Sequence, residues 1–482
     1  MKKIFLFIVL LAAAGCLTAA ETVTYDRERG IVVRDSAESF KVSLWDDAKK
    51  ENEGFVASAY SVDGEAVISW EKIVPGETLR LRVISTGRSH PDRLISPPVP
   101  VSVRLLHTGW INGSRSVSSE YTAEAAFGGE MFGGRPEDYE PALARLGIML
   151  CGAGYLRGGK PDTEALGGLL ESMGFANVEK YNYYGSEQTE RSDRAGIYLA
   201  HRKIYDGSKE RELLLCMVRG TVGGEWFSNF DVGDTGAHKG FTAAAADGAA
   251  IVKSYLSEHP LPGDSVIMLT GHSRGAAVAQ IMSLGIDKLG FEKVFCYVYA
   301  CPNYTRHPMK DKSGRFSFMY EGDLVPGIPM WDFGVDGSVI DSGSFSPDEK
   351  ARLKEVFSQT AGGIKCVAFS AAEKNKIINE LTALAPNPVA FYQIVYKKSG
   401  IIKKVTPMTT YEFCVAMGKA MVEGNLKSAI RVPKDFDGII WAFITDGAAS
   451  PKIIQSHSVE MYLSMTEVYN SRFSAAEKTD GP

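Results

Sequence analysis

One serine lies in a setting that suits a nucleophile. The segment Gly271-His272-Ser273-Arg274-Gly275 fits the pattern G-x-S-x-G, in which a serine on a tight turn between a strand and a helix exposes its hydroxyl. The flanking glycines let the strand and the helix pass closely. The pattern also arises by chance in Gly-rich chains, but here the apolar run SVIMLT precedes it and the small-residue run AAVAQIMSLGI follows it. We therefore predict Ser273 as a nucleophile.

A serine nucleophile needs a neighbouring base, usually a histidine. In sheets that carry this turn, the chain order is serine, acid, histidine. Two histidines follow Ser273: His307 in a polar, loop-like stretch, and His457 where a helix begins. Chain order favours His457 as the base, and His307 is predicted to be a surface residue.

A carboxylate must orient the imidazole. Asp323 follows the strand-like run 316–320 in the segment MYEGDLVPGIP, so its loop can reach a histidine on a neighbouring loop. We predict Asp323 as this acid, with Glu321 and Asp332 as alternatives. The charge that develops on the substrate oxygen also needs two donors. These are predicted to be the N–H of Arg274 and a group in Arg219-Gly220-Thr221, which follows the strand LLLCMV; the alternative is a plain turn.

Helices alternate with apolar strands from residue 136 onward. We expect helices over 139–150, 162–173, 240–259, 275–288 and 456–470, and strands over 194–205, 212–218, 266–270, 294–300 and 316–320. This alternation is typical of an α/β protein with a largely parallel sheet. Residues 136–470 are the predicted α/β domain, and residues 471–482 a frayed tail.

The segment before this domain has a different pattern. Residues 21–107 contain short alternating runs separated by turn signals such as Asp63-Gly64, which predicts an antiparallel β-sandwich of the immunoglobulin-like kind. Residues 108–135, rich in Gly and Ser, are expected to form a connector. Within the α/β domain we expect a helical insertion at 345–450, with helices at 347–358, 371–385, 409–423 and 434–443.

Composition narrows the class of protein. The 482 residues are 45% hydrophobic and 23% charged, with a formal net charge of −5, which argues against disorder, a multi-span membrane protein and a basic nucleic-acid binder. None of the seven cysteines forms a C-x-x-C pair, and the Gly-rich runs lack the Lys-Ser/Thr of a phosphate loop. We therefore expect neither a metal nor a cofactor.

The N-terminus has the pattern of an export signal. Two lysines precede an apolar run, residues 4–11, that is too short to span a bilayer, so residues 1–20 are predicted to be a signal peptide. The segment LAAAGC resembles the lipobox of bacterial lipoproteins, which implies lipidation of Cys16 and a membrane anchor in the bacterial cell envelope. The alternative is cleavage after Ala20, which would give a secreted or periplasmic protein.

Several motifs together, in chain order, resemble the class 3 (fungal-type) lipase family, a branch of the α/β-hydrolases. They are CMVRGT with EWFSNFD, AHKGF, GHSRGAAVA, YACPN with EGDLVPGIP, and SHSVEMYL, spread over 139–463. The resemblance implies an α/β-hydrolase fold and a lipase or esterase that acts on an ester or lipid substrate without a cofactor. It also implies Ser273 as nucleophile, Asp323 as acid, His457 as base, and Thr221 and Arg274 as oxyanion donors.

The sequence departs from the family pattern at the turn itself. Arg274 stands where the family usually has Leu, and Ala276 where it has Gly. The Arg274 side chain either favours a polar or acidic substrate or points away and pairs with a local carboxylate. The interval from Asp323 to His457 is also long, hence the predicted insertion, whose Phe391-Tyr392 and Trp441-Ala442-Phe443 line an acyl pocket or belong to a core.

Two further functions remain open from the sequence. A phospholipase, thioesterase or peptidase uses the same fold, because specificity depends on the pocket. A surface binding protein, in which the β-rich segment carries the function and the hydrolase domain is vestigial, is the alternative from another class.

Overall fold

The chain forms two compact units, which are described separately below. The N-terminal unit contains the residues up to Pro100 with 127–133 and 204–210, and the α/β unit contains most of the rest. The computed structural model describes residues 22–183, 193–375, 389–408 and 455–479, apart from short interruptions at 27–28, 36–38, 48, 50–53, 75, 77, 86–87, 90–91, 112–113, 155, 158–159, 162, 222–224, 234–235, 311–313, 329–332, 364, 366–367 and 398–399.

A seven-stranded sheet forms the centre of the α/β unit. Its strands, in spatial order, are β13 (Ala176–Tyr181), β14 (Ile197–Tyr205), β15 (Glu210–Val218), β16 (Val266–His272), β17 (Lys293–Tyr299), β18 (Arg315–Met319) and β19 (Ser338–Asp341). The last five strands are parallel to one another, and β13 pairs antiparallel with β14. The carboxyl ends of β15, β16 and β18 therefore lie at one edge, where loops can combine residues from distant parts of the chain.

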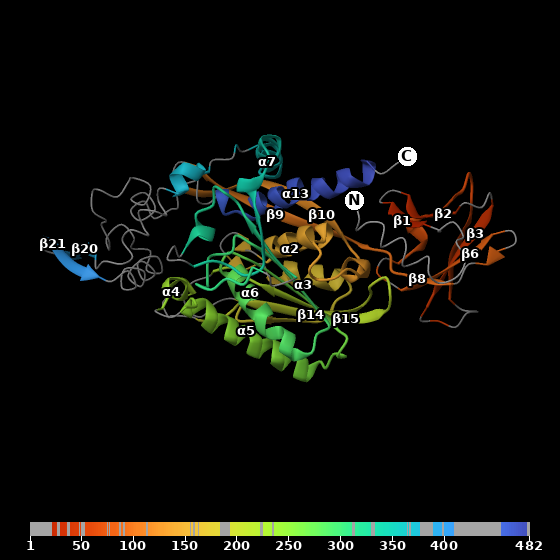
Figure 1. Ribbon diagram of the computed structural model, residues 1–482, viewed down its shortest axis with the longest axis horizontal. Coiled ribbons are helices and arrows are strands. Elements are labelled where there is room, and N and C mark those ends of the chain that lie inside the picture. Colours follow the sequence, from red (N-terminus) through yellow and green to blue (C-terminus); the bar gives the residue numbers. More distant parts are fainter. Residues whose placement is uncertain are drawn as a thin grey trace. The chain divides into compact units, whose positions relative to one another are not determined.

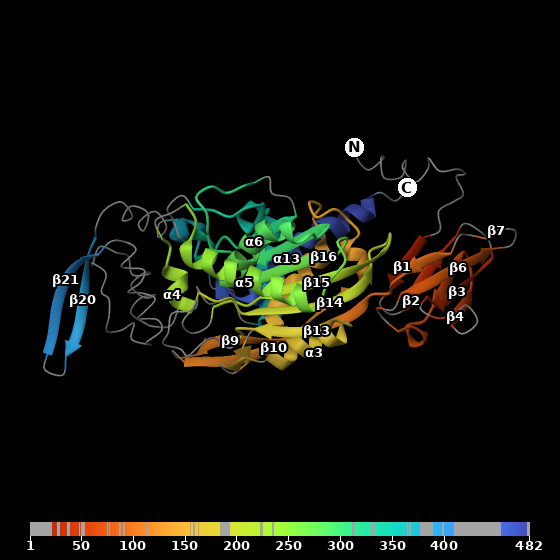
Figure 2. The same cartoon turned by 90° about the horizontal axis from the view of Figure 1, so that it is seen from below.

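Helices cover both faces of this sheet, as Figures 1 and 2 show. On one face, α5 and α6 pack on alternate residues of the central strands, including Leu269 and Val298. On the other face, α2 meets the intervening residues: the Tyr299 hydroxyl donates to the carbonyl of Ala144, and the Tyr297 hydroxyl accepts from the N–H of Glu140. Both sets are buried, which explains why these strands are apolar at nearly every position.

The helices of this unit lie close to where the sequence predicts them, except that α4 (Glu225–Phe230) was not predicted and that the last helix continues to Thr479, through most of the expected frayed tail at 471–482. They are α2 (Pro141–Ala153), α3 (Thr163–Ser172), α4 (Glu225–Phe230), α5 (Lys239–Glu258), α6 (Arg274–Ile286), α7 (Pro347–Thr360) and α13 (Val459–Thr479). In α7, Ser346 caps the first turn by accepting from the N–H of Glu349, whose carboxylate accepts from the N–H of Ser346. Within the described part of the chain, none of the helices combines the length and apolar character that a bilayer crossing needs.

The N-terminal unit is an antiparallel β-sandwich. One sheet has the order β1 (Thr22–Asp26), β2 (Gly30–Arg34), β5 (Glu65–Ile68), and the other the order β4 (Phe55–Tyr60), β3 (Phe40–Asp46), β6 (Leu79–Ser85), β7 (Arg88–Ser89), with β8 (Arg93–Ile95) also on β6. Their inward side chains share one core, in which Ile31 and Val33 of the first sheet lie with Val42 and Leu81 of the second. The alternating pattern of the sequence reflects these inward and outward positions.

The expected connector at 108–135 is not what the structure shows. A two-stranded sheet of β9 (Val99–Ile111) and β10 (Ser114–Phe127) occupies most of it, followed by a short 3-10 helix, Gly129–Phe132. The dipeptide Asn112-Gly113 between the strands is a strong hairpin signal in the sequence, and the Gly and Ser content obscured it.

The segment expected to be a helical insertion is only partly helical where the structure describes it. Helix α7 is present, but β20 (Val389–Lys397) and β21 (Gly400–Met408) form an antiparallel hairpin. The runs VAFYQIVYK and GIIKKVTPM are rich in β-branched and aromatic residues around a Ser-Gly turn signal, a pattern typical of a hairpin. The helices expected at 409–423 and 434–443, most of the one at 371–385, Trp441-Ala442-Phe443, the signal peptide and Cys16 lie outside the described residues, as do the Phe391 and Tyr392 side chains.

Candidate active site

The backbone at Ser273 has the shape that a strand-to-helix nucleophile turn requires. Ser273 has φ = 58°, a left-handed conformation that is uncommon for a non-glycine residue. It lies between the end of β16 and the start of α6. A Cβ on Gly271 would lie 2.3 Å from the Gly275 carbonyl oxygen, and one on Gly275 would lie 2.2 Å from that of Val218. Both glycines are therefore needed for the close approach of strand and helix.

Three side chains from distant parts of the sequence form a hydrogen-bonded series. The Nδ1 of His457 lies 2.8 Å from Oδ2 of Asp323, and its Nε2 lies 2.8 Å from Oγ of Ser273. An ionised carboxylate can only accept, so Nδ1 carries the hydrogen and Nε2 is free to accept from the serine hydroxyl. The structure thus brings together the three residues that the sequence singled out as nucleophile, acid and base.

Asp323 is fully buried and held by donors on both oxygens. Its Oδ1 accepts from the N–H of Val325 at 3.0 Å, and its Oδ2 accepts from His457 and from the Tyr462 hydroxyl, the latter at 2.7 Å. The loop after β18 carries the aspartate, and α13 carries the tyrosine. Tyr462 has no signal in the sequence beyond being a tyrosine near the start of a helix.

The alternative acids and base lie elsewhere or outside the described residues. Glu321 pairs with Lys350, with Oε2 and Nζ 2.8 Å apart. His307 is exposed in the loop after β17. Asp332 lies outside the described residues.

The predicted oxyanion residues Thr221 and Arg274 are joined through Asn229, near the C-terminal end of α4. The Thr221 hydroxyl oxygen accepts from Nδ2 of Asn229 at 2.8 Å, and Oδ1 of the same amide accepts from Nη1 of Arg274 at 3.1 Å. The two loops that carry the predicted donors are therefore joined through one amide. Asn229 lies in the EWFSNFD segment but was not among the predicted site residues.

The Arg274 side chain points into the protein. It is 2% exposed and donates to Oγ of Ser228 at 3.0 Å and to the carbonyl of Arg194 at 3.2 Å, while its Nε lies 4.0 Å from Oε2 of Glu225. Of the two interpretations left open by the sequence, the geometry agrees with the one in which this cation points away and lies beside a local carboxylate. Burial lowers the pKa of Arg274 from its ordinary value.

Glu225 joins this cation to a second one. Both of its oxygens accept from Arg219, at 2.9 Å and 3.2 Å, and the two side chains are nearly inaccessible to solvent. The Arg219 guanidinium also lies over the ring of Tyr183. Because a buried carboxylate is costly without partners, this pair fixes the start of α4 against the end of β15.

Two other buried histidines lie close to these residues. The ring of His272 lies 4.8 Å from that of His457, centroid to centroid, and burial lowers the pKa of His272 well below its ordinary value. His238 caps α5: its Nδ1 accepts from the N–H of Phe241 at 3.3 Å, and its Nε2 donates to the carbonyl of Asn229 at 3.1 Å. Burial lowers the pKa of His238 to about 3, so it is neutral at ordinary pH.

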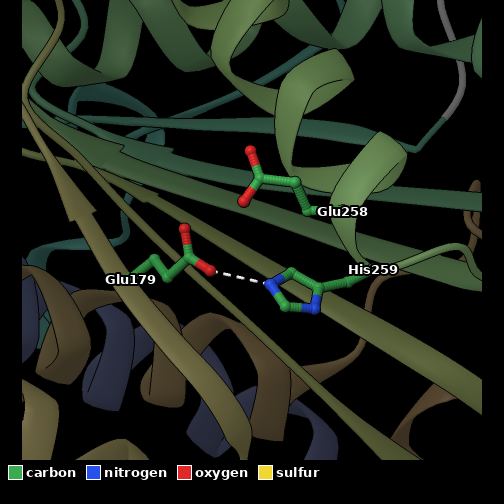
Figure 3. A group of neighbouring side chains, drawn as sticks. All are labelled: Glu179, Glu258 and His259. Atoms are coloured by element: carbon green, nitrogen blue, oxygen red, sulfur yellow. Dashed lines mark hydrogen bonds and ion pairs between the residues drawn. The ribbon is translucent and has the colours of Figure 1, made fainter.

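One group of side chains has the spacing of possible metal ligands. Glu179, Glu258 and His259 offer ligand atoms within 4.8 Å of one another, and Figure 3 shows both carboxylates beside the imidazole. However, Nε2 of His259 already lies 2.7 Å from Oε1 of Glu179. A hydrogen bond between these two side chains accounts for this contact without a metal ion. The three residues lie on β13 and at the C-terminal end of α5.

The arrangement around Ser273 suits acyl transfer. A hydroxyl, an imidazole and a buried carboxylate bonded in series can move the serine proton as the oxygen attacks a carbonyl carbon. The strained turn exposes the hydroxyl, and the first turn of α6 presents backbone N–H groups beside it.

Comparisons with known proteins give a family match and several similar solved structures. Residues 213–333 match the family model described as Lipase (class 3). The similar structures include the Rhizomucor miehei triacylglyceride lipase, with 16% identity over 41% of this chain and 78% of that chain and a TM-score of 0.28. Lip2 lipase from Yarrowia lipolytica shows 20% identity over 41% and 76%, with a TM-score of 0.26. A mutant form of MDLA from Penicillium cyclopium shows 19% identity over 42% and 78%, with a TM-score of 0.29.

No curated protein sequence matches this chain significantly. The segment matched by the family model runs from β15 through the turn at Ser273 to the loop beyond Asp323. It contains most of β15, all of β16, β17 and β18, and the turn and the loop that carry two of the three bonded side chains. Residues 213–333 thus match the class 3 lipase family model and carry the turn at Ser273 and the loop with Asp323 within the α/β unit.

Proposed function

We propose that the protein is a serine hydrolase that cleaves carboxylic esters, with Ser273 as nucleophile, His457 as base and Asp323 as orienting acid. The single observation that supports this most is the pair of 2.8 Å contacts from His457 to Ser273 and to Asp323. The left-handed backbone of Ser273 supports it independently, because such strain persists where it positions a reacting group.

The reaction proceeds in two halves. The Ser273 oxygen attacks the ester carbonyl carbon while Nε2 of His457 takes its proton, and the N–H of Arg274 with Thr221 stabilises the resulting oxyanion. The bond to the leaving oxygen then breaks, and His457 gives the proton to the departing alcohol. Water, activated by the same imidazole, attacks the acyl-enzyme, releases the acid and restores Ser273.

A lipid ester is the substrate class that the family match favours. The inward-pointing Arg274 also supports an uncharged ester, since its guanidinium is only 2% exposed. Phospholipid, thioester and peptide substrates use the same chemistry, so a panel of neutral acyl esters of increasing chain length, phospholipids and acyl thioesters ranks them.

The test is the loss of ester hydrolysis in Ser273→Ala, measured with p-nitrophenyl esters. We expect the rate to fall by more than about a thousand-fold, the usual cost of removing such a nucleophile. Ser254→Ala, at an exposed position on α5, is the matched control and keeps the wild-type rate. Hydrolysis by Ser273→Ala at the wild-type rate would refute the proposal. A wild-type protein that a fluorophosphonate does not label would favour the surface-binding alternative.

We further propose that the protein is exported and anchored in the cell envelope through lipidated Cys16, as the LAAAGC segment indicates. Palmitate labelling of cells that express the full chain, with Cys16→Ser as the control, tests this. Equal labelling of both proteins would exclude the anchor. An unlabelled wild-type protein whose chain begins after Ala20 would support the alternative, a secreted or periplasmic protein.

A further inference from the structure

Tyr462 contacts the acid of the proposed triad, Asp323, and not the nucleophile. It is fully buried on the first turn of α13, five residues after His457. Its hydroxyl lies 2.7 Å from Oδ2 of Asp323, and that same oxygen lies 2.8 Å from Nδ1 of His457. The oxygen of Asp323 that orients the imidazole therefore has a second contact.

The direction of this hydrogen bond is fixed by a third group. The N–H of Tyr320 lies 3.2 Å from the Tyr462 oxygen and can only donate to it. The phenol therefore accepts from Tyr320 and keeps its own proton for Asp323. Burial, with the neighbouring carboxylate as a smaller cause, raises the pKa of Tyr462 well above its ordinary value, so the phenol remains a donor over the whole range of enzyme assays.

We propose that Tyr462 is a positioning residue for the proposed reaction, which holds the Asp323 carboxylate in one orientation and disperses the charge on the oxygen that His457 uses. This inference rests on the proposed function. Tyr462 acts through Asp323 and His457 and touches no reacting atom.

Two consequences follow from this role. Without the phenol, Oδ2 of Asp323 keeps one of the two donors found among the described residues, the imidazole, and the carboxylate loses one of the three described contacts that fix its rotation. More of its negative charge is then available to stabilise a positively charged imidazole. The imidazole should consequently become protonated at a higher pH than in the wild type. A protonated imidazole can no longer act as a base.

The other groups that face these side chains do not change in this comparison. Asp341 of β19 is the further carboxylate with an electrostatic effect on Tyr462, and His272 of β16 packs its ring against both Tyr462 and His457. Ser273 faces the imidazole from the opposite side. Removing the Tyr462 hydroxyl leaves all of these in place.

The structure offers a matched control in the same unit. Tyr304 is a second buried tyrosine, whose hydroxyl donates to Oδ2 of Asp336 at 2.7 Å and accepts from the N–H of Asp336 at 3.0 Å. Tyr304→Phe therefore removes the same chemical interaction from a buried carboxylate that has no contact with His457 in the structure. Both variants lose stability, but only one should change the chemistry.

The experiment compares Tyr462→Phe and Tyr304→Phe in pH profiles of kcat and kcat/KM. For Tyr462→Phe we expect kcat to fall about ten-fold with KM unchanged, and the acidic limb of kcat/KM to move up by about half a pH unit to one unit. In the Asp323→Asn background, Tyr462→Phe should have little further effect, because its route of action is gone. If Tyr462→Phe does not fold, 3-fluorotyrosine at this position keeps the shape, is a stronger donor, and should move the limb to lower pH.

A second readout does not depend on turnover. The 13Cε1 resonance of His457 is assigned by its loss in His457→Gln. It should titrate at a higher pH in Tyr462→Phe than in the wild type, and at the same pH in Tyr304→Phe as in the wild type. A wild-type protein without ester hydrolysis refutes the proposed function, and the resonance still decides the inference. An unchanged titration and an unchanged kcat in Tyr462→Phe, or equal changes in both variants, would overturn it.

Discussion

Replacing Arg274 by Leu tests whether the charge beside the nucleophile acts on substrate or on structure. If the guanidinium lay about 4 Å from a bound anionic ester in a solvated site, the attraction between the two charges would be about 1 kcal/mol. This attraction would raise kcat/KM for the anionic ester roughly five-fold over that for a neutral ester. The buried orientation predicts instead that the ratio of rates for anionic and neutral esters does not change in Arg274→Leu.

The same substitution should cost stability. It removes hydrogen bonds to Ser228, Asn229 and the carbonyl of Arg194, each worth about 1 kcal/mol. Glu225 keeps its two contacts with Arg219, so it is not left as an unpaired buried charge, and Leu restores apolar burial. We expect the free energy of unfolding to fall by about 2–4 kcal/mol.

The assay combines urea unfolding with kinetics on an anionic and a neutral ester of equal acyl length. Arg315→Leu is the control, because Arg315 is also buried and donates to the hydroxyl and the carbonyl of Ser283. We expect Arg315→Leu to lose similar stability and keep kcat, and Arg274→Leu also to lose kcat several-fold as Asn229 and Thr221 loosen. Unaltered stability with a loss confined to the anionic ester would refute this reasoning.

Three further predictions concern the same unit. Because burial lowers the pKa of His238 to about 3 from 6.5, the unfolded chain binds the extra proton. The contribution of neutral His238 to the free energy of unfolding is thus fully present above pH 6.5, and below that pH it falls by up to about 1.4 kcal/mol per pH unit. His238→Asn, which keeps a cap acceptor, should flatten this slope in denaturant titrations from pH 7 to 4. Gly275→Ala should abolish ester hydrolysis and lower the melting temperature, because its Cβ would lie 2.2 Å from the Val218 carbonyl oxygen, whereas Gly285→Ala, which meets nothing within 4 Å, should do neither. Thr221→Val should lower kcat about ten-fold or more by removing a hydroxyl while Thr221→Ser keeps most of it; equal rates would show that only the backbone N–H takes part.

The sequence was informative about the sheet and its loops. The apolar runs at β15, β16, β17 and β18, with helical periodicity before β16 and before β17, predicted the alternation that the structure shows. Chain order then selected Asp323 and His457 from a short list of acids and histidines, because the order of residues along this fold follows the order of its strands.

The sequence was less informative where a compositional pattern competed with a local one. Gly and Ser suggested a connector where β9 and β10 pair, and the surrounding helical patterns obscured the β20–β21 hairpin. In both places a short turn signal carried the information, and pairing with the adjacent strand, which propensity within one strand does not show, decided the outcome.

What the sequence by itself determined was the type and order of the reacting residues, since a serine turn, a strand-end aspartate and a late histidine are local patterns. What only the tertiary structure decided was which groups face them. The direction of the Arg274 side chain, the amide of Asn229 between two loops and the Tyr462 hydroxyl on Asp323 depend on contacts between residues 45 to 139 positions apart, or on a loop and the helix that follows it. Such contacts leave no periodic trace in a sequence, because burial and hydrogen-bond geometry arise only when the elements pack.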